Sequence, residues 1–511
     1  MTAKPTAHWV PHPHLLLGTL TLNSVTVTLD STIANVALPH MQGGLGATQD
    51  QIGWVLTSYI VATAICLPLT GILTARIGRR RFMMGSVIGF MVASMLCGTA
   101  TSLTEMVAFR ILQGMFGACL PSLGQVTLIE SYPPEKHGKL LSIWGFGAMM
   151  GPVLGPSLGG YLTEALNWRW VFYINVPICL LSLVGIAIAV PDTERNHRSK
   201  FDFFGFGTLA LMLGSFQLML DRGHSLNWFQ SAEIMLEAAI AALCAYLFVV
   251  HMLTAREPFL KPVMFRDRNL LMALILMFLS QAVLISTSAL VPSFLQQLMH
   301  IPVDTTGYLM MPRGIGSMLG MLVCGRLIGR VANRNLLIFG FAVTAFTTYQ
   351  LTQINLNVDN ATILQISLLQ GFGMSFSFAP LTATAFLTLA PQLRNDGAAI
   401  SILMRNLGAS VGISVLLSRI AHDTQANHAH LTERITQFAE NDLPQLWQWQ
   451  HSAGAMLLNE EITRQATSVA YLNAFTVLVW CSVLALPVCL LLKAPKQKQH
   501  PDPAAVATAA D

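Results

Sequence analysis

The stretch LLLGTLTLNSVTVTLDSTIANVAL, residues 15–38, decides the fold, because it is long enough to cross a bilayer yet carries an acid, Asp30, well inside it. A helix of about twenty apolar residues spans the hydrocarbon core of a membrane. A carboxylate at the centre of such a helix costs about 2.5–3.5 kcal/mol on insertion scales, so it usually marks a functional site with a partner. We interpret Asp30 as a functional residue. A neutralised carboxyl used only for packing is the alternative.

The composition predicts a polytopic membrane protein. Of the 511 residues, 53% are hydrophobic and only 11% are charged, against about 25% charged in a soluble domain, so apolar side chains must face lipid. The net charge of +4 is too small to indicate nucleic acid as a partner. All eight cysteines lie inside apolar runs without a CxxC pair, which argues against a disulfide framework and a zinc site. We expect a lipid bilayer around the chain, and neither a metal nor a cofactor in it.

Fourteen apolar runs of spanning length follow one another along the chain. They lie near 15–38, 52–75, 82–100, 106–129, 140–162, 169–190, 203–220, 232–253, 269–292, 306–328, 335–354, 361–389, 399–418 and 470–492. An even number of crossings places both termini on one side. Most of the 29 Lys and Arg residues then fall in loops on the side of the termini, which predicts that both termini are cytoplasmic.

An internal repeat divides the runs into two related sets. GILTARIGRR at 71–80 is echoed by GRLIGRVANR at 325–334, LQG at 112–114 recurs at 369–371, and Gly151 and Gly155 recur as Gly408 and Gly412. Related halves are common in transporters. We expect a six-helix bundle at 1–200, two inserted transmembrane helices with their connections at 201–262, and a second six-helix bundle at 263–511.

The first run presents a polar face that includes Asp30. Thr19, Asn23, Thr26 and Asp30 follow one another at helical spacing, so they share one side of a helix. Arg110, in the run FRILQG, lies at a similar predicted depth, in the outer half of the membrane. We therefore predict that the two charges meet. A structural bond from Arg110 to backbone carbonyls is the alternative.

The repeat supports a special role for Arg110, because its counterpart in the second half is Ser367. The scaffold thus does not require an arginine at this place. A buried acid beside a cation is switched by proton binding, since a neutral Asp30 would release Arg110.

Two further motifs suggest moving parts. In the fifth run glycines recur every fourth residue, and two prolines remove backbone donors between them: Gly147, Gly151, Pro152, Gly155, Pro156 and Gly159. This pattern predicts a smooth, bendable stripe, with plain helix packing as the alternative. The basic loop after the second run and its echo at 325–334 predict a latch that holds helices together on the cytoplasmic side. The alternative is that the positive charges only fix the orientation in the membrane. The residues concerned are Arg76, Gly78, Arg79, Arg80 and Arg330.

The segment 420–468 contains His422, His428, His430 and His451 but lacks the spacing and partners of a metal site. We interpret it as a partly helical extracytoplasmic loop that would also suit docking of a partner protein.

The motifs together resemble the major facilitator superfamily, specifically its fourteen-helix drug:proton antiporters of the EmrB/QacA type. The resemblance rests on LDSTIANVALP, GILTARIGRR, RILQG, GPVLGPSLGG, WRWVFYINVP, FDFFG and RNDGAAISILMRNLGASVG. It implies the major facilitator fold in the cytoplasmic (inner) membrane, efflux rather than uptake, and proton coupling through Asp30 and Arg110. It also makes a periplasmic adaptor and an outer-membrane channel candidate partners. Ala75 departs from the pattern, because the loop motif usually has an Asp there.

We therefore expect proton-coupled efflux of lipophilic small molecules by alternating access around a midplane cavity. Candidate cavity residues are Asn23, Thr26, Gln113, Gln125, Gln281 and Gln370. Because Asp30 is the one acid deep in a span, neutral or weakly acidic substrates fit better than dications. A dedicated exporter of one metabolite, lipid or siderophore is the alternative. A membrane enzyme would need a concentrated polar constellation at the interface, and the sequence contains none.

Overall fold

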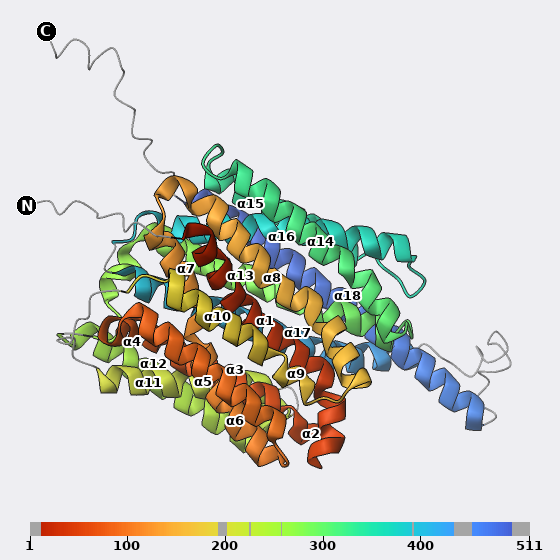
Figure 1. Cartoon of the computed structure of the whole chain (residues 1–511). Coiled ribbons are helices and arrows are strands. Elements are labelled where there is room, and N and C mark those ends of the chain that lie inside the picture. Colours follow the sequence, from red (N-terminus) through yellow and green to blue (C-terminus); the bar gives the residue numbers. More distant parts are fainter. Residues whose placement is uncertain are drawn as a thin grey trace, which may run out of the picture.

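The computed structural model describes residues 12–192, 202–223, 226–256, 258–390, 393–433 and 452–492, and within these ranges the chain forms helices and no β-strand. Long helices run side by side through the molecule (Figure 1). The first set comprises α1 (Pro13–Leu45), α2 (Gln49–Ile52), α3 (Trp54–Cys66), η1 (Leu67–Leu69), α4 (Thr70–Ile77), α5 (Arg79–Thr99), α6 (Leu103–Gly117), α7 (Cys119–Ser131), α8 (Pro134–Ala165), α9 (Trp170–Tyr173) and α10 (Asn175–Ala189).

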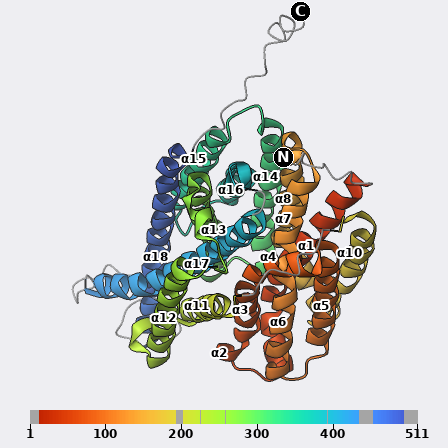
Figure 2. The ribbon, with the colours of Figure 1, turned by 90° about the vertical axis from the view of Figure 1, so that its left-hand side faces the viewer.

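Two long helices and two short turns follow: α11 (Phe203–Gly223), η2 (Trp228–Gln230), α12 (Ala232–Thr254) and η3 (Pro262–Arg266). The second set comprises α13 (Arg268–Gln297), α14 (Val303–Leu327), α15 (Asn333–Leu351), α16 (Asn360–Leu387), α17 (Arg394–Glu433) and α18 (Ser452–Leu490). Figure 2 shows α1, α3, α5, α6 and α10 on one side and α13, α15, α16 and α18 on the other.

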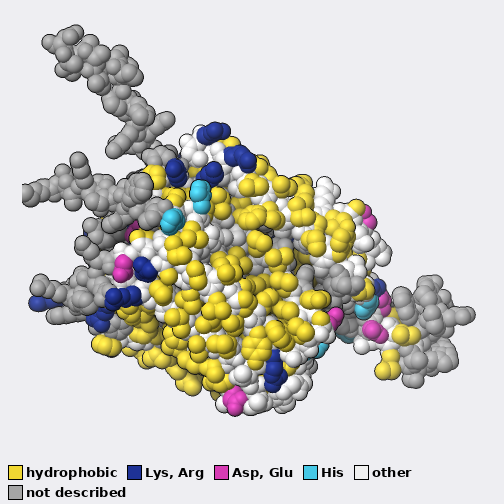
Figure 3. Space-filling view, in the orientation of Figure 1, with side chains coloured by type: hydrophobic (Ala, Val, Ile, Leu, Met, Phe, Trp, Pro, Cys, Tyr) yellow, Lys and Arg dark blue, Asp and Glu magenta, His cyan; other side chains and the backbone are white. Residues whose placement is uncertain are grey.

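Each predicted run coincides with helical structure, and ten helices of the described ranges are long and apolar enough to cross a membrane. The helices α1, α8, α14 and α15 fall outside these ten. Two of the four, α1 and α8, carry many polar or glycine residues, which suit a helix that packs mainly against protein. The number of fourteen crossings stays a prediction. Apolar side chains cover the middle of the surface, and most Lys and Arg visible on this face lie toward its margins (Figure 3).

The repeat is visible in how the helices pack. A Cβ added at Gly151 of α8 would lie 2.6 Å from the backbone N of Leu29 on α1. The equivalent Gly412 of α17 approaches α13, where an added Cβ would lie 2.8 Å from Cα of Ala282. Gly114 packs against the backbone of α3, and Gly371 packs against the backbone of α14 in the same way. Glycines that recur in the sequence thus mark equivalent close approaches in the two sets.

Helix α11 is bonded to both sets. On one side Ile65 of α3 packs at Gly214, and Thr57 donates a hydrogen bond to Asp221. On the other side the amide of Gln217 donates a hydrogen bond to the hydroxyl of Ser410 on α17, at 2.9 Å. Helix α11 therefore lies beside the junction of the two sets, and Figure 2 shows α12 packed on the outer side of α11.

A carboxylate ties the start of α11 to the end of α12. Asp202 accepts hydrogen bonds from the backbone N of Gly205 at 2.8 Å, from His251 Nε2 at 2.9 Å and from the backbone N of Phe259 at 2.9 Å. Burial opposes ionisation, but these donors outweigh it and hold the pKa of Asp202 below its usual value.

We expect Asp202→Asn to lower the free energy of unfolding at neutral pH by about 1–2 kcal/mol. Because the folded pKa is depressed, the wild-type contribution is complete above the pKa of the unfolded carboxyl, about 4, and is lost as the pH falls through the folded value. Thermal unfolding in lipid nanodiscs at several pH values measures this. The control is Asp359→Asn, at the exposed start of α16, where an Asn caps the helix as well. Equal losses in the two variants would contradict the prediction.

Two helix ends differ from the expected bounds. Helix α1 continues to Leu45, so Asp30 lies near its middle rather than toward an outer end. Helix α17 continues to Glu433 and α18 already begins at Ser452, so most of the expected loop 420–468 is helical. The two extensions pair, since Asn427 donates to the carbonyl of Ala466 at 3.3 Å and His428 contacts Asn459 at 3.0 Å. A search of the sequence for apolar runs of spanning length misses such helical extensions because their residues are polar.

The helical extensions of α17 and α18 project from the body at the right of Figure 1. His422 and His430 are exposed there, and the described ranges contain no group of three potential metal ligands. His451 and the rest of 434–451 lie outside the described residues.

The largest buried apolar cluster is shared between the two sets of helices. It joins Leu67, Ile129 and Leu141 of the first set with Leu270 and Met321 of the second. Ile129 lies near the end of α7, and Leu270 lies near the start of α13, so the cluster occupies one end of the helices, which we call the closed end. The buried clusters toward the opposite end stay within one set each, at residues 33–172 and 283–478.

Candidate functional site

Four helices of the first set bring one charge pair and its partners together. Asp30 comes from α1, Arg110 and Gln113 from α6, Asn175 from the start of α10, and Ser94 from α5. Arg110 and Gln113 are one turn apart, so both side chains point to the same side of α6. Each of these five side chains is 0% exposed. The site is therefore a polar network sealed inside the helix bundle.

The carboxylate of Asp30 accepts three hydrogen bonds. Arg110 Nη1 donates to Oδ2 at 2.8 Å, while Gln113 Nε2 and Asn175 Nδ2 donate to Oδ1 at 2.9 and 2.6 Å. Ser94 Oγ accepts hydrogen bonds from the same two side-chain amides, from Gln113 at 3.2 Å and from Asn175 at 3.0 Å. Its hydroxyl donates to the backbone carbonyl of Phe172. The predicted contact between Asp30 and Arg110 is thus present, and it is reinforced by neutral donors.

The rest of the Arg110 guanidinium is held by helix α3. Its Nε donates to the carbonyl of Val55 at 3.0 Å, and its Cζ lies 4.4 Å from the ring centroid of Tyr59. Both contacts considered for Arg110 from the sequence, an ion pair with Asp30 and a hydrogen bond to a backbone carbonyl, are therefore present. Among the residues that the structure describes, its Nη2 has no hydrogen-bond partner. Removing one member of a buried ion pair costs about 3–5 kcal/mol, because it leaves an uncompensated charge.

Asn175, Ser94 and Tyr59 were missed by the sequence-based list. Asn175 is part of the motif WRWVFYINVP, but an Asn at the start of a helix is usually interpreted as the residue that caps the helix N-terminus. Ser94 lies in an apolar run where a lone hydroxyl normally bonds to its own helix. No spacing rule within one helix reveals either residue, because their partners are on other helices.

The remaining polar residues of the α1 face pack against protein. Asn23 Oδ1 accepts a hydrogen bond from Ser182 on α10, and Thr26 donates to the carbonyl of Leu22 at 2.8 Å. Both are buried, and Thr19 packs at Gly185 of α10. In this conformation the face contacts α10, so a cavity role for Asn23 and Thr26 stays a prediction.

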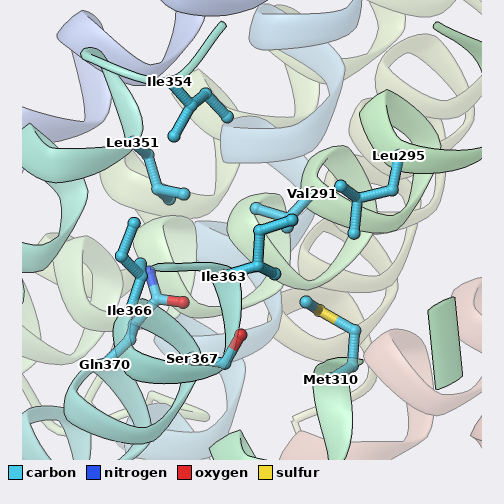
Figure 4. Close-up of a pocket in the computed structure, with 9 residues that line it drawn as sticks. All are labelled: Val291, Leu295, Met310, Leu351, Ile354, Ile363, Ile366, Ser367 and Gln370. Atoms are coloured by element: carbon cyan, nitrogen blue, oxygen red, sulfur yellow. The ribbon is translucent and has the colours of Figure 1, made fainter. Parts of the chain in front are cut away.

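The predicted glutamines are distributed over both sets. Gln125 on α7 is buried, and its Nε2 has no hydrogen-bond partner within the described part of the chain. Gln281 on α13 is half-buried. Gln370 and Ser367 on α16 line a small cavity of about 10 Å³ between α13, α14, α15 and α16 (Figure 4), room for one water molecule. At the positions equivalent to Arg110 and Gln113, the second set therefore has the polar residues Ser367 and Gln370, which form no ion pair with any described residue.

The glycine stripe of α8 packs on the helix that carries Asp30. Gly147 faces Thr21, and Gly151 faces Thr28 and the backbone of Leu29. An added Cβ would lie 2.9 Å from Cβ of Thr32 at Gly155 and 3.1 Å from the carbonyl O of Ile33 at Gly159. Thr32 also donates to the carbonyl of Gly151 at 3.1 Å. Pro152 and Pro156 belong to α8, but their side chains lie outside the described residues.

The basic loop between α4 and α5 lies at the closed end. Arg79 forms an ion pair with Glu130 of α7, and Arg80 donates to the carbonyl of Ala187. Arg76 is half-buried, whereas Arg330 in the echo is exposed. The turn depends on Gly78, whose φ of 91° favours glycine. Gly329 has a φ of 89° and stands at the repeat position of Ala75, so the two loops turn at different residues.

Comparison with known proteins identifies the fold family. The sequence profile of the Major Facilitator Superfamily matches residues 20–413. The chain is 32% identical over 437 residues to the Multidrug export protein EmrB of Escherichia coli (strain K12), with 84% of each chain covered. It is 33% identical over 473 residues to the Fatty acid resistance protein FarB of Neisseria gonorrhoeae, with 91% of this chain and 93% of the relative covered.

The structure has the same fold as solved transporters. The human organic anion transporter MFSD10 (TETRAN) superposes with a TM-score of 0.59 at 14% identity, covering 92% of this chain and 100% of that one. The matching profile spans well over half of the chain, and the helical architecture agrees with it. The chain therefore belongs to the major facilitator superfamily of membrane transporters, and it is not an enzyme.

Proposed function

We propose that this protein exports lipophilic small molecules across the cytoplasmic membrane in exchange for protons, as a fourteen-helix antiporter of the EmrB/QacA type. The observation that carries the proposal is the buried network of Asp30 and Arg110, in which Asp30 lies on α1, the helix that also packs along the glycine stripe of α8. A titratable group fixed to a packing surface of this kind couples protonation to helix movement. The multidrug export named for the relatives at about one-third identity supports the substrate class.

The orientation follows from charge. The closed end carries the loops with Arg79, Arg80, Arg266 and Arg268, and loops rich in Lys and Arg stay in the cytoplasm. Both termini are then cytoplasmic. Because the shared apolar cluster closes this end while the clusters toward the other end are separate, the structure corresponds to a state closed to the cytoplasm.

In the proposed cycle, Asp30 takes up a proton from the outside. The neutral carboxyl no longer balances Arg110, and the charge-assisted bonds that hold α1 to α6 and α10 weaken. The halves rock, the closed end parts, and a substrate enters from the cytoplasm as the proton leaves. Asp30 then pairs again with Arg110, which favours return to the structure described here. Since both residues are 0% exposed, proton transfer requires local opening of the helices around them.

A dedicated exporter of one metabolite, lipid or siderophore is the second candidate, because the charge network would serve either substrate range. The FarB relative is named for fatty acid resistance, which favours a lipid-like compound among single substrates. A periplasmic adaptor and an outer-membrane channel are proposed partners, and the projecting extensions of α17 and α18 offer a surface on the outer side.

Proteoliposomes with an imposed pH gradient test the function. We expect addition of a transported compound to dissipate the gradient, and the gradient to drive accumulation of that compound, across a panel of unrelated lipophilic molecules. Activity with one compound only would favour the dedicated exporter. Efficient export of a divalent quaternary ammonium compound would refute the preference for neutral or weakly acidic substrates, and transport insensitive to the pH gradient would refute the antiport.

A further inference from the structure

Phe378 of α16 is a side chain of the second set that reaches into the core of the first. One buried apolar cluster is built from residues between 16 and 190, all of the first set, and Phe378 is the one described residue of the second set that packs against it. The same ring also packs against the cluster that the two sets share at the closed end. Phe378 therefore joins the two clusters across the boundary between the halves.

The first set receives this ring on α8. The ring centroids of Phe378 and Trp144 lie 6.0 Å apart, with an angle of 35° between the ring planes, and Trp144 is buried. A Cβ added at the next residue, Gly145, would lie 3.0 Å from Cδ1 of Phe378 and 2.6 Å from Cε of Met321. Because Gly145 has no side chain, two side chains of the second set can approach the backbone of α8 closely at this point.

Arg405 of α17 holds the ring from the side of the second set. Its Cζ lies 4.2 Å from the centroid of the Phe378 ring, which is a cation–π contact. Its Nη2 donates to the hydroxyl of Thr382 at 2.9 Å, and that hydroxyl donates to the backbone carbonyl of Phe378 at 3.1 Å. Arg405 thus contacts the ring directly and the backbone of the same residue through Thr382. All three residues belong to the second set, so these contacts need not break when the halves part.

We propose that Phe378 is the gate residue of the closed end and that Arg405 is its positioning residue. Before a substrate can enter from the cytoplasm, the halves must separate here, and the Phe378 ring must leave Trp144 and Gly145. Burial of an aromatic ring contributes enough free energy to shift a two-state equilibrium by about tenfold or more. This inference rests on the proposed function, in which the halves rock, and names the contact that must open.

A pair of introduced cysteines reports whether this end is closed. A Cβ added at Gly325 of α14 would lie 3.1 Å from Cβ of Ser142 on α8, and the Cβ atoms of a disulfide lie about 3.5–4.5 Å apart. Ser142→Cys combined with Gly325→Cys should therefore form a disulfide between the halves when the end is closed and not when it is open. Cys324→Ala is present in every variant, because this natural thiol is adjacent to position 325.

The test is the rate of disulfide formation with copper phenanthroline in the purified full-length protein in nanodiscs, without substrate or a pH gradient, with the bond identified by mass spectrometry. Phe378→Ala should lower this rate by about tenfold, because the ring no longer holds the first set. Phe372→Ala is the matched control on the same helix, since its ring contacts Phe339 and Phe376 of the second set, and its rate should stay within about twofold of the unsubstituted residue. Equal rates for the two variants would overturn the proposal.

Arg405→Gln should lower the rate by less than Phe378→Ala, and Arg405→Lys should restore part of it, because the cation over the ring is kept. In the Phe378→Ala background, Arg405→Gln should cause no further loss, because Arg405 acts through the ring. Additive losses would overturn the positioning role. Should Phe378→Ala fail to fold, Phe378→Leu and Phe372→Leu decide in its place: a lower rate for the first alone supports the gate, and equal rates overturn it.

The disulfide assay requires neither proton coupling nor substrate, so the two proposals fail separately. A slower disulfide in Phe378→Ala together with transport insensitive to the pH gradient would refute the antiport and leave the gate standing. Gradient-driven transport with a disulfide rate that Phe378→Ala does not change would refute the gate and leave the antiport standing. The completed disulfide should also stop transport until it is reduced, and transport at the full rate after oxidation would overturn the gate.

Discussion

Asp30→Asn is expected to abolish transport driven by a pH gradient while leaving equilibrium binding of substrate measurable. The amide has nearly the same shape as the carboxylate but cannot bind and release a proton. It also leaves Arg110 buried without a counter-charge, which should lower the free energy of unfolding by about 3–5 kcal/mol. Accumulation of substrate in proteoliposomes and thermal unfolding in nanodiscs measure the two effects.

A double variant separates coupling from stability. Asp30→Asn combined with Arg110→Gln removes both charges of the pair, so the variant should recover much of the lost stability yet still fail to couple. Unchanged proton-driven transport in Asp30→Asn would refute proton coupling through Asp30. If proton-driven transport depends only on the arginines of the basic loop, Arg76→Ala should abolish it, whereas Asp30→Asn should retain it.

Gly151→Ala is expected to have the second largest effect, through packing rather than charge. A Cβ at this position would lie 2.6 Å from the backbone N of Leu29 and closer still to the hydroxyl of Thr28. Backbone atoms cannot rotate away, so α8 and α1 must move apart, next to the helix segment that holds Asp30. Overpacking of this kind typically costs about 1–3 kcal/mol, and transport should fall with the altered helix contact.

Gly160 on the same helix is the matched control, because a Cβ there meets no atom within 4 Å. Gly160→Ala should be neutral or stabilising by up to about 1 kcal/mol, since Ala favours the helix. Unfolding temperature and initial transport rate, measured for both variants in the same lipid, check the pair. Equal behaviour of the two variants would show that the stripe is not a close contact in the working protein.

Much of the arrangement was predictable from the sequence. The position of a residue along a spanning helix determines its depth, and helical periodicity determines the side of the helix on which it lies. The contact of Asp30 with Arg110 followed from these two quantities, although the end of α1 was placed too early, before Leu45. The same reasoning could not find Asn175 or Ser94, because hydrogen bonds between helices depend on how the helices are rotated against one another. Asn23 illustrates the converse: it lies on the predicted polar face, but that face is covered by α10.

The inserted helix α11 has a consequence for the energetics of the cycle. It is bonded to α3 of one half through Thr57 and Asp221 and to α17 of the other through Gln217 and Ser410. When the halves rotate against each other, α11 can follow only one of them, so one set of bonds must break or re-form with each turnover. The strength of these bonds therefore acts as a bias on the conformational equilibrium, and the ratio of outward-facing to inward-facing molecules can change through residues that touch neither proton nor substrate.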